Sequence, residues 1–157
     1  MDSWRLLLTP PARGAWNMAV DEAILENIGR GASLPTLRLY AWTPACLSLG
    51  HAQPFSDVDA VRLKQRGWDV VRRATGGRAI LHTDELTYSV IAPLKEPRVE
   101  GGVLESYNRL AQALLTAVKN LETRTCEALK LRAFRRKKPD RSMSQCRFED
   151  LQFFYGS

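Results

Sequence analysis

The chain has 157 residues, of which 45% are hydrophobic and 25% are charged, and its formal net charge is +6. This composition is ordinary for one soluble globular domain with a real hydrophobic core. No apolar run approaches the roughly 20 residues that a membrane helix needs, and the N-terminus lacks the features of a signal peptide, so we expect a cytoplasmic protein without a membrane partner.

The first predicted elements alternate between strand and helix. Residues 4–8 form an apolar strand that the following proline pair ends. A helix follows, with Asn17 as its candidate N-cap, Asp21 and Glu22 in its first turn, and Gly29 near its end.

The middle of the chain is predicted to hold short strands and one short helix. Residues 37–40 and 46–49 have the composition and length of strands. Ser56 or Asp57 is predicted to cap a short helix that Gly67 closes.

A predicted β-hairpin comes next, with strands at residues 70–71 and 79–81 and a turn at residues 75–77. Residues 86–91 form another strand, and apolar residues at steps of three and four predict a long helix over residues 104–121. We expect this helix to lie across one face of the sheet. The mixed order of elements favours an α+β domain over a doubly wound parallel sheet.

The basic residues are concentrated at the C-terminal end. Residues 130–157 hold eight Lys and Arg against three Asp and Glu, a net +5, which leaves +1 for the remainder. Periodicity also fails beyond about residue 130. We therefore predict a core over residues 1–130 and a basic, atypical tail over residues 131–157 that need not be folded. The charge run lacks interleaved aromatic residues, which disfavours a nucleic-acid partner.

The most informative stretch is the predicted hairpin. Arg72 and Arg73 precede the Gly76–Gly77 pair, and His82 follows within one strand length. Glycine allows a backbone to approach a ligand closely, and arginine can bind a carboxylate, a phosphate or a polarised carbonyl. A plain hairpin with solvated arginines explains the local pattern equally well, because Gly-Gly turns are common.

Five segments in a fixed order resemble the catalytic domain shared by lipoate–protein ligases, octanoyltransferases and biotin–protein ligases. The segments are residues 17–23, 37–44, 47–53, 72–82 and 84–90. The resemblance covers residues 1 to about 129 and is closest to the lipoate-ligase-like octanoyltransferases. The ligases usually carry a third glycine where this chain has Arg78.

The resemblance implies a mixed, largely antiparallel sheet flanked by helices, with a tunnel for a medium acyl chain. Ala79 and Leu81 are expected to face the alkyl tail, and His82 is expected to orient a thioester or carbonyl, although a structural histidine is an alternative. We expect Tyr40 and Trp42 to be part of the core or of the tunnel wall, and Asp84 and Glu85 to cap or to pair with a neighbouring arginine. The substrate-contact set implied by position is Arg72, Arg73, Thr75, Gly76, Gly77, Arg78, Ala79, Ile80, Leu81 and His82.

The resemblance also implies a cysteine nucleophile. Cys46 reads as a buried strand residue and Cys126 has no motif around it, whereas Cys146 lies roughly where the nucleophile of such enzymes falls. The three cysteines form no metal-binding pattern. The resembling enzymes continue beyond their cysteine with a strand and a lysine-containing segment, so we expect this domain to be incomplete at its C-terminus, through truncation or a shifted reading frame.

The predicted function is transfer of an octanoyl or lipoyl group from acyl carrier protein to a lipoyl-domain lysine through a cysteine acyl-enzyme, without a cofactor. The acceptor would be a lipoyl-domain protein such as glycine cleavage H protein or a dehydrogenase E2 subunit. One alternative is an ATP-dependent lipoate–protein ligase with ATP as its cofactor. It needs a catalytic lysine, and no lysine here lies in a recognisable motif. The other alternative is an inactive, truncated acyl-binding domain.

Overall fold

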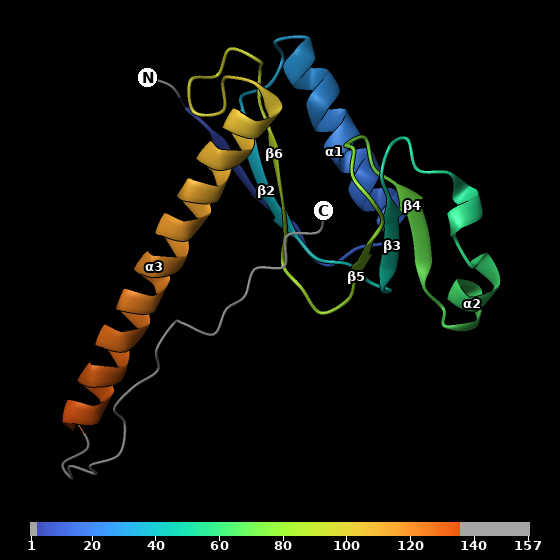
Figure 1. Cartoon of the computed structure of the whole chain (residues 1–157). Helices are drawn as coiled ribbons and strands as arrows, with labels where there is room; N and C mark the ends of the chain where they lie inside the picture. Colours follow the sequence, from blue (N-terminus) through green and yellow to red (C-terminus); the bar gives the residue numbers. More distant parts are fainter. Residues whose placement is uncertain (1–2, 136–157) are drawn as a thin grey trace. The chain divides into compact units, whose positions relative to one another are not determined.

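The computed structural model describes residues 3–135 of the chain, with side chains to residue 124. The chain divides into two compact units, Met1–Leu110 and Ala111–Ser157. The first unit holds the six strands β1–β6, the helices α1 and α2, and the start of α3 (Figure 1).

The strands of the first unit form two small sheets. In one, β2 (Thr36–Tyr40) lies between β1 (Arg5–Leu8), which is parallel to it, and β6 (Thr87–Ile91), which is antiparallel. In the other, β3 (Cys46–Leu49) lies between the parallel strand β4 (Asp69–Arg72) and the antiparallel strand β5 (Ile80–His82). The predicted α+β class with mixed sheets is confirmed, and the pairings divide evenly between parallel and antiparallel.

The predicted hairpin between β4 and β5 is wrong. Both strands pair with β3, one on each side of it, so they do not pair with each other. The segment that joins them, residues 73–79, therefore spans the end of β3 and is not a tight turn. His51 N–H donates to the carbonyl of Thr75, and Arg73 N–H donates to the carbonyl of Leu49, which fastens this segment to the end of β3.

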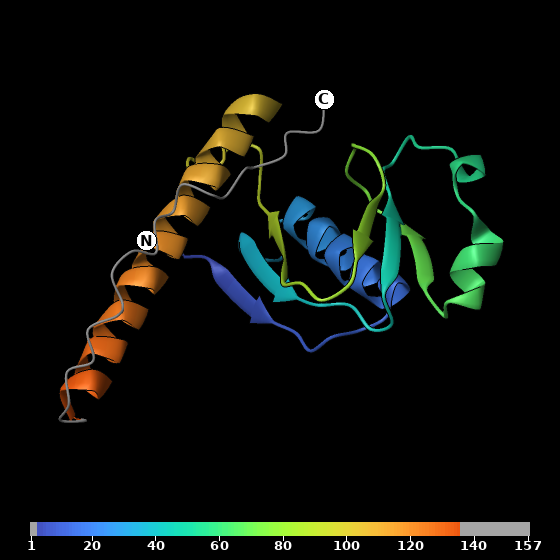
Figure 2. The same ribbon diagram turned by 60° about the horizontal axis from the view of Figure 1, so that its bottom comes forward.

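Helix α1 (Gly14–Gly29) contacts β4 of one sheet and β6 of the other, and in Figure 2 it extends from one sheet to the other. It begins three residues before the predicted N-cap, so Asn17 is inside the helix, and Asp21 and Glu22 lie beyond its first turn. A Cβ on Gly14 would lie 2.5 Å from Cys46 Sγ, which shows how closely this end of the helix approaches β3. The predicted capping role of Asn17 is wrong because its side chain is used for tertiary contacts.

The short helical segment follows the prediction with a shifted start. A 3₁₀ turn covers Phe55–Asp57, and α2 covers Ala60–Gln65. The cap is Asp59, whose carboxylate accepts a 2.9 Å hydrogen bond from Arg62 N–H, and not Ser56 or Asp57. Gly67 has φ +67°, a conformation that favours glycine and ends the helix.

The buried cluster of the first unit consists of Tyr40, Trp42 and Cys46, with Met18 and Val71 packed against it. This cluster joins α1 to both sheets and forms the floor beneath the candidate site.

Helix α3 (Val103–Arg135) extends beyond the range that its apolar periodicity predicts, and most of it belongs to the second unit. Its expected packing on a sheet face concerns both units and stays a prediction. Of the helices described, not one combines the length and apolarity that a bilayer crossing requires.

Candidate functional site

A cavity of about 480 Å³ lies within the first unit, lined by α1, both sheets and the segment that follows β4. Its apolar wall includes Met18, Leu25, Trp42, Ile80 and Val90. The volume falls within the range of small-ligand pockets, and an apolar wall with a few polar groups is typical of such sites.

Strand register decides which predicted contacts reach the cavity. Ile80 and His82 line it, whereas Ala79 and Leu81 are not among its lining residues. Successive side chains of a strand point to opposite faces, so Leu81 lies on the other face of β5. The expectation that Ala79 and Leu81 face an alkyl tail therefore differs from the structure by one residue of register.

Arg72 and Arg73, which precede the glycine pair, bind backbone carbonyls of the neighbouring segments. Arg73 donates from Nη2 to the carbonyls of Gly76 and Arg78, each at 2.7 Å, and from Nη1 to the carbonyl of Ser48 at 2.9 Å. Burial lowers the pKa of the Arg73 guanidinium. Arg72 Nη1 donates to the carbonyls of residues 50, 51 and 53 at 2.5–3.0 Å. Only Arg73 of this pair lines the cavity, and its terminal nitrogens are engaged with carbonyls.

The glycines of the motif allow two backbone segments to meet. A Cβ on Gly50 would lie 1.8 Å from the carbonyl oxygen of Gly77, so only glycine fits at position 50 without moving the loop. Gly77 itself has φ +87°. Gly76, Gly77 and Arg78 are thus parts of a loop that Arg73 closes, and they are not among the cavity-lining residues, while Thr75 is.

His82 lies at the centre of a hydrogen-bonded chain. Its Nε2 lies 2.8 Å from Ser48 Oγ, and its Nδ1 lies 2.6 Å from Glu85 Oε1. The imidazole also stacks on Trp42, with ring centroids 4.1 Å apart and planes 12° apart. With only 7% of His82 exposed, the ring is held in one orientation from three sides.

Glu85 is the acidic end of this chain. Burial by itself raises the pKa of Glu85, but hydrogen bonds from His82 and Thr87 outweigh that effect and hold the pKa below its ordinary value. Thr87 Oγ1 lies 2.7 Å from Glu85 Oε1 and accepts a 2.7 Å bond from Trp42 Nε1. Glu85 was expected to be a cap or to pair with an arginine, and instead its carboxylate bonds to the side chains of His82 and Thr87.

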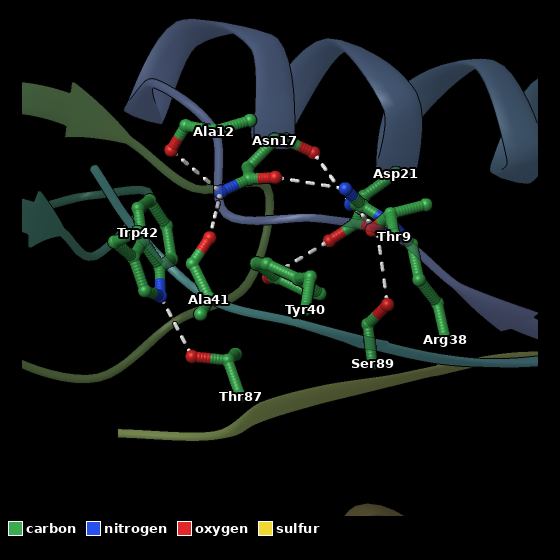
Figure 3. A network of polar contacts seen from close by, with 10 residues as sticks. All are labelled: Thr9, Ala12, Asn17, Asp21, Arg38, Tyr40, Ala41, Trp42, Thr87 and Ser89. Atoms are coloured by element: carbon green, nitrogen blue, oxygen red, sulfur yellow. Dashed lines mark hydrogen bonds and ion pairs between the residues drawn. The ribbon is translucent and has the colours of Figure 1, made fainter. Parts of the chain in front are cut away.

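A second polar network joins α1 to the first sheet (Figure 3). Arg38 is fully buried and donates to Asp21 Oδ1 at 2.7 Å, to Asn17 Oδ1 at 2.8 Å and to the carbonyl of Asn17 at 3.0 Å. Tyr40 and Ser89 hydroxyls donate to the same carboxylate at 3.2 and 3.0 Å. Burial first, and then Asp21, raises the pKa of the Tyr40 phenol. Asp21, Tyr40 and Ser89 all line the cavity, so this network forms its second polar region.

Four residues of the predicted contact set line the cavity: Arg73, Thr75, Ile80 and His82. Sequence reasoning missed Met18, Asp21, Ser48 and Ser89 as lining residues. Alternation offered one signal, because Ser48 lies two residues from the buried Cys46 on the same face of β3. Tyr40 and Trp42, read from sequence as core or tunnel wall, are both buried and both line the cavity.

Among the cysteines, the structure describes the surroundings of Cys46 but not those of Cys146. Cys46 is fully buried, and burial together with Asp69 raises the pKa of its thiol to about 12, which makes it a poor nucleophile. The predicted nucleophile, Cys146, lies outside the described residues. The buried structural role expected for Cys46 agrees with its position.

Comparison with known proteins places this geometry in a family. Residues 13–135 match the model of the lipoyl protein ligase A/B catalytic domain. The octanoyltransferase LipM of Moorella thermoacetica is 48% identical over 121 residues, which are 76% of this chain and 44% of that protein. Octanoyltransferase LipM of Staphylococcus aureus is 42% identical over 121 residues, again 76% of this chain and 44% of the relative.

Two solved structures of lipoate–protein ligases are also similar to this chain. A bipartite lipoate protein ligase from Thermoplasma acidophilum, described with its E2 lipoyl domain, is 33% identical with a TM-score of 0.50, over 57% of this chain and 36% of that one. A lipoate-protein ligase A bound with ATP is 32% identical with a TM-score of 0.50, over 56% and 36% of the two chains. The chain spans less than half the length of the curated relatives it matches. It belongs to the lipoyl protein ligase A/B catalytic domain family.

Proposed function

We propose that the protein transfers an octanoyl group from acyl carrier protein to a lysine of a lipoyl-domain protein through a cysteine acyl-enzyme. The observation that carries the proposal is the cavity between the two sheets, with its apolar wall and its few polar groups. It occurs in a chain 42–48% identical to proteins named octanoyltransferase LipM.

The cavity suits an alkyl chain. Each buried CH₂ contributes about 0.8 kcal/mol, so a medium chain can be anchored without a charged partner. Ile80, Met18 and Val90 supply apolar surface, and Ser48 and His82 are polar groups of the same cavity wall.

Charge favours a neutral acyl thioester over an acyl-adenylate. Among the described residues that line the cavity, Arg73 is the only lysine or arginine, and its Nη1 and Nη2 already donate to carbonyl oxygens. A phosphate in this cavity would therefore compete with three backbone carbonyls for that guanidinium. A thioester needs no such partner, and it carries the energy for transfer without a nucleotide.

In the proposed reaction a cysteine thiolate attacks the thioester carbonyl and releases the carrier thiol. The lysine amine of the acceptor then attacks the acyl-cysteine, loses a proton and regenerates the thiol. Cys146 is the proposed nucleophile.

The test is incubation of the chain with octanoyl acyl carrier protein, followed by peptide mass mapping. We expect an octanoyl increment on the peptide that contains Cys146, and transfer to an added lipoyl domain. Unchanged transfer of octanoate to the lipoyl domain by a Cys146→Ala variant would overturn the assignment.

The second candidate is an ATP-dependent lipoate–protein ligase, which the likeness to a ligase bound with ATP favours. Pyrophosphate release that depends on both lipoate and ATP would select this function. Ligand protection against melting without turnover of either kind would instead indicate an acyl-binding domain.

A further inference from the structure

Ser48, His82 and Glu85 form one hydrogen-bonded line at the cavity wall. Ser48 comes from β3, His82 from the end of β5, and Glu85 from the connection to β6. The two distances along the line, 2.8 Å from Ser48 Oγ to His82 Nε2 and 2.6 Å from His82 Nδ1 to Glu85 Oε1, are hydrogen-bond distances.

The donors and acceptors of this line are determined by their neighbours. The Trp42 indole can only donate, so Thr87 Oγ1 accepts from it and gives its own proton to Glu85. Glu85, whose pKa is held below its ordinary value, is a carboxylate that only accepts. His82 Nδ1 therefore donates to Glu85, and in the neutral imidazole Nε2 accepts a hydrogen bond from the Ser48 hydroxyl.

We propose that Ser48, His82 and Glu85 form a serine acyl-transfer triad, a second nucleophilic centre that accepts medium-chain acyl groups from thioesters or activated esters. A hydroxyl bonded to an imidazole that a carboxylate orients is the arrangement that activates serine, and it is identified by geometry and roles rather than by sequence position. This centre is independent of Cys146.

Arg73 adds to the activation of Ser48. Its Nη1 lies 3.2 Å from Ser48 Oγ and donates to it, which stabilises negative charge developing on that oxygen. The hydroxyl gives its proton to His82 and accepts from Arg73, which leaves one lone pair for attack. Ser48 is 1% exposed and lines the cavity, so its hydroxyl is screened from bulk water beside the apolar wall.

The proposed reaction has two steps, acylation of Ser48 and hydrolysis of the acyl-serine. Ser48 Oγ attacks the acyl carbonyl while its proton moves to His82 Nε2; the carbon–sulfur bond, or the ester carbon–oxygen bond, breaks and the leaving group takes that proton. Water then attacks the acyl-serine and gives a proton to Nε2, and Ser48 recovers this proton as the acid leaves. The net result is hydrolysis of the acyl ester or thioester to a carboxylic acid and an alcohol or thiol.

The test uses the whole chain and p-nitrophenyl octanoate. We expect a burst of nitrophenolate and an octanoyl group that peptide mapping locates on Ser48. Neutral hydroxylamine separates the two nucleophiles, because it cleaves a thioester on cysteine and leaves an oxygen ester on serine. Labelling that hydroxylamine removes completely, or an octanoyl group found only on cysteine, overturns the triad and leaves the proposed cysteine reaction untouched.

Variants test the roles within the line. Ser48→Ala should abolish the octanoyl labelling that resists hydroxylamine, while Ser56→Ala, at an exposed serine of the 3₁₀ turn, should retain it. Glu85→Gln keeps the size of the side chain and removes its charge, so it should slow acylation at least about 100-fold. An unchanged rate in Glu85→Gln would contradict the positioning role, and the wild-type map remains decisive if Ser48→Ala does not fold.

Discussion

Arg38 Nη1 lies 2.7 Å from Asp21 Oδ1, and this ion pair joins β2, the middle strand of the first sheet, to α1. The guanidinium is fully buried, whereas one fifth of the Asp21 side chain is exposed. Arg38 also packs over the Tyr40 ring, 4.0 Å from its centroid, so charge, hydrogen bonds and aromatic contact coincide here. The pair fixes the wall from which Asp21, Tyr40 and Ser89 reach the cavity.

Replacing Arg38 with methionine should destabilise the fold strongly. The change removes the four hydrogen bonds that the Arg38 side chain donates, so Asp21 and Asn17 each lose a buried partner. We expect the free energy of unfolding to fall by a value on the order of 3 kcal/mol. Urea unfolding measures it. Arg30→Met is the matched control, because the Arg30–Glu26 pair is exposed and should contribute under about 0.5 kcal/mol. Equal losses in the two variants would contradict the account.

Gly50→Ala should distort the loop at residues 73–79. Its new methyl group would lie 1.8 Å from the Gly77 carbonyl oxygen, so the loop must move, at about 1–3 kcal/mol of stability. Thermal unfolding measures the change. Gly29→Ala, where nothing lies within 4 Å, should leave the melting temperature unchanged or raise it. A Gly50→Ala protein as stable as the wild type would refute the close approach.

Most strands and the long helices were predictable because each depends on local composition and periodicity. The pairing of the strands was not predictable from the sequence. Residues 70–71 and 79–81 were predicted to form a hairpin, whereas the strand pairing shows that β3 lies between them. Asn17 illustrates the same limit, since its side chain donates to the carbonyls of Ala12 and Ala41 across the fold instead of capping its helix. His82 was recognised from its motif, and its partner Glu85 lies only three residues further on, but its partner Ser48 comes from a separate strand through a tertiary contact that no spacing encodes.

The ionised Glu85 side chain should stabilise the folded protein, and its protonation at acidic pH should remove that stabilisation. Its pKa in the folded protein lies below the ordinary value of 4.5, so the folded state binds the proton less readily than the unfolded chain. The stabilisation is therefore fully present above about pH 6, and it is lost as the pH falls through 4.5 toward the lower folded pKa. Unfolding free energies of wild type and Glu85→Gln should converge over this range. A difference that stays constant from neutral pH into strong acid would contradict it.

The cavity between the two sheets is the proposed site of the acyl chain, and two neighbouring residues of β5 test this directly. Ile80 lines the cavity and Leu81 lies on the other face, while the two are similarly exposed, at 47% and 42%. The measurement is the affinity for octanoyl amide, by calorimetric titration, of wild type, Ile80→Asp and Leu81→Asp. A carboxylate in the apolar wall should weaken binding at least about tenfold in Ile80→Asp, and Leu81→Asp should bind like the wild type. Weaker binding in Leu81→Asp than in Ile80→Asp, or equal binding in all three, would contradict the account.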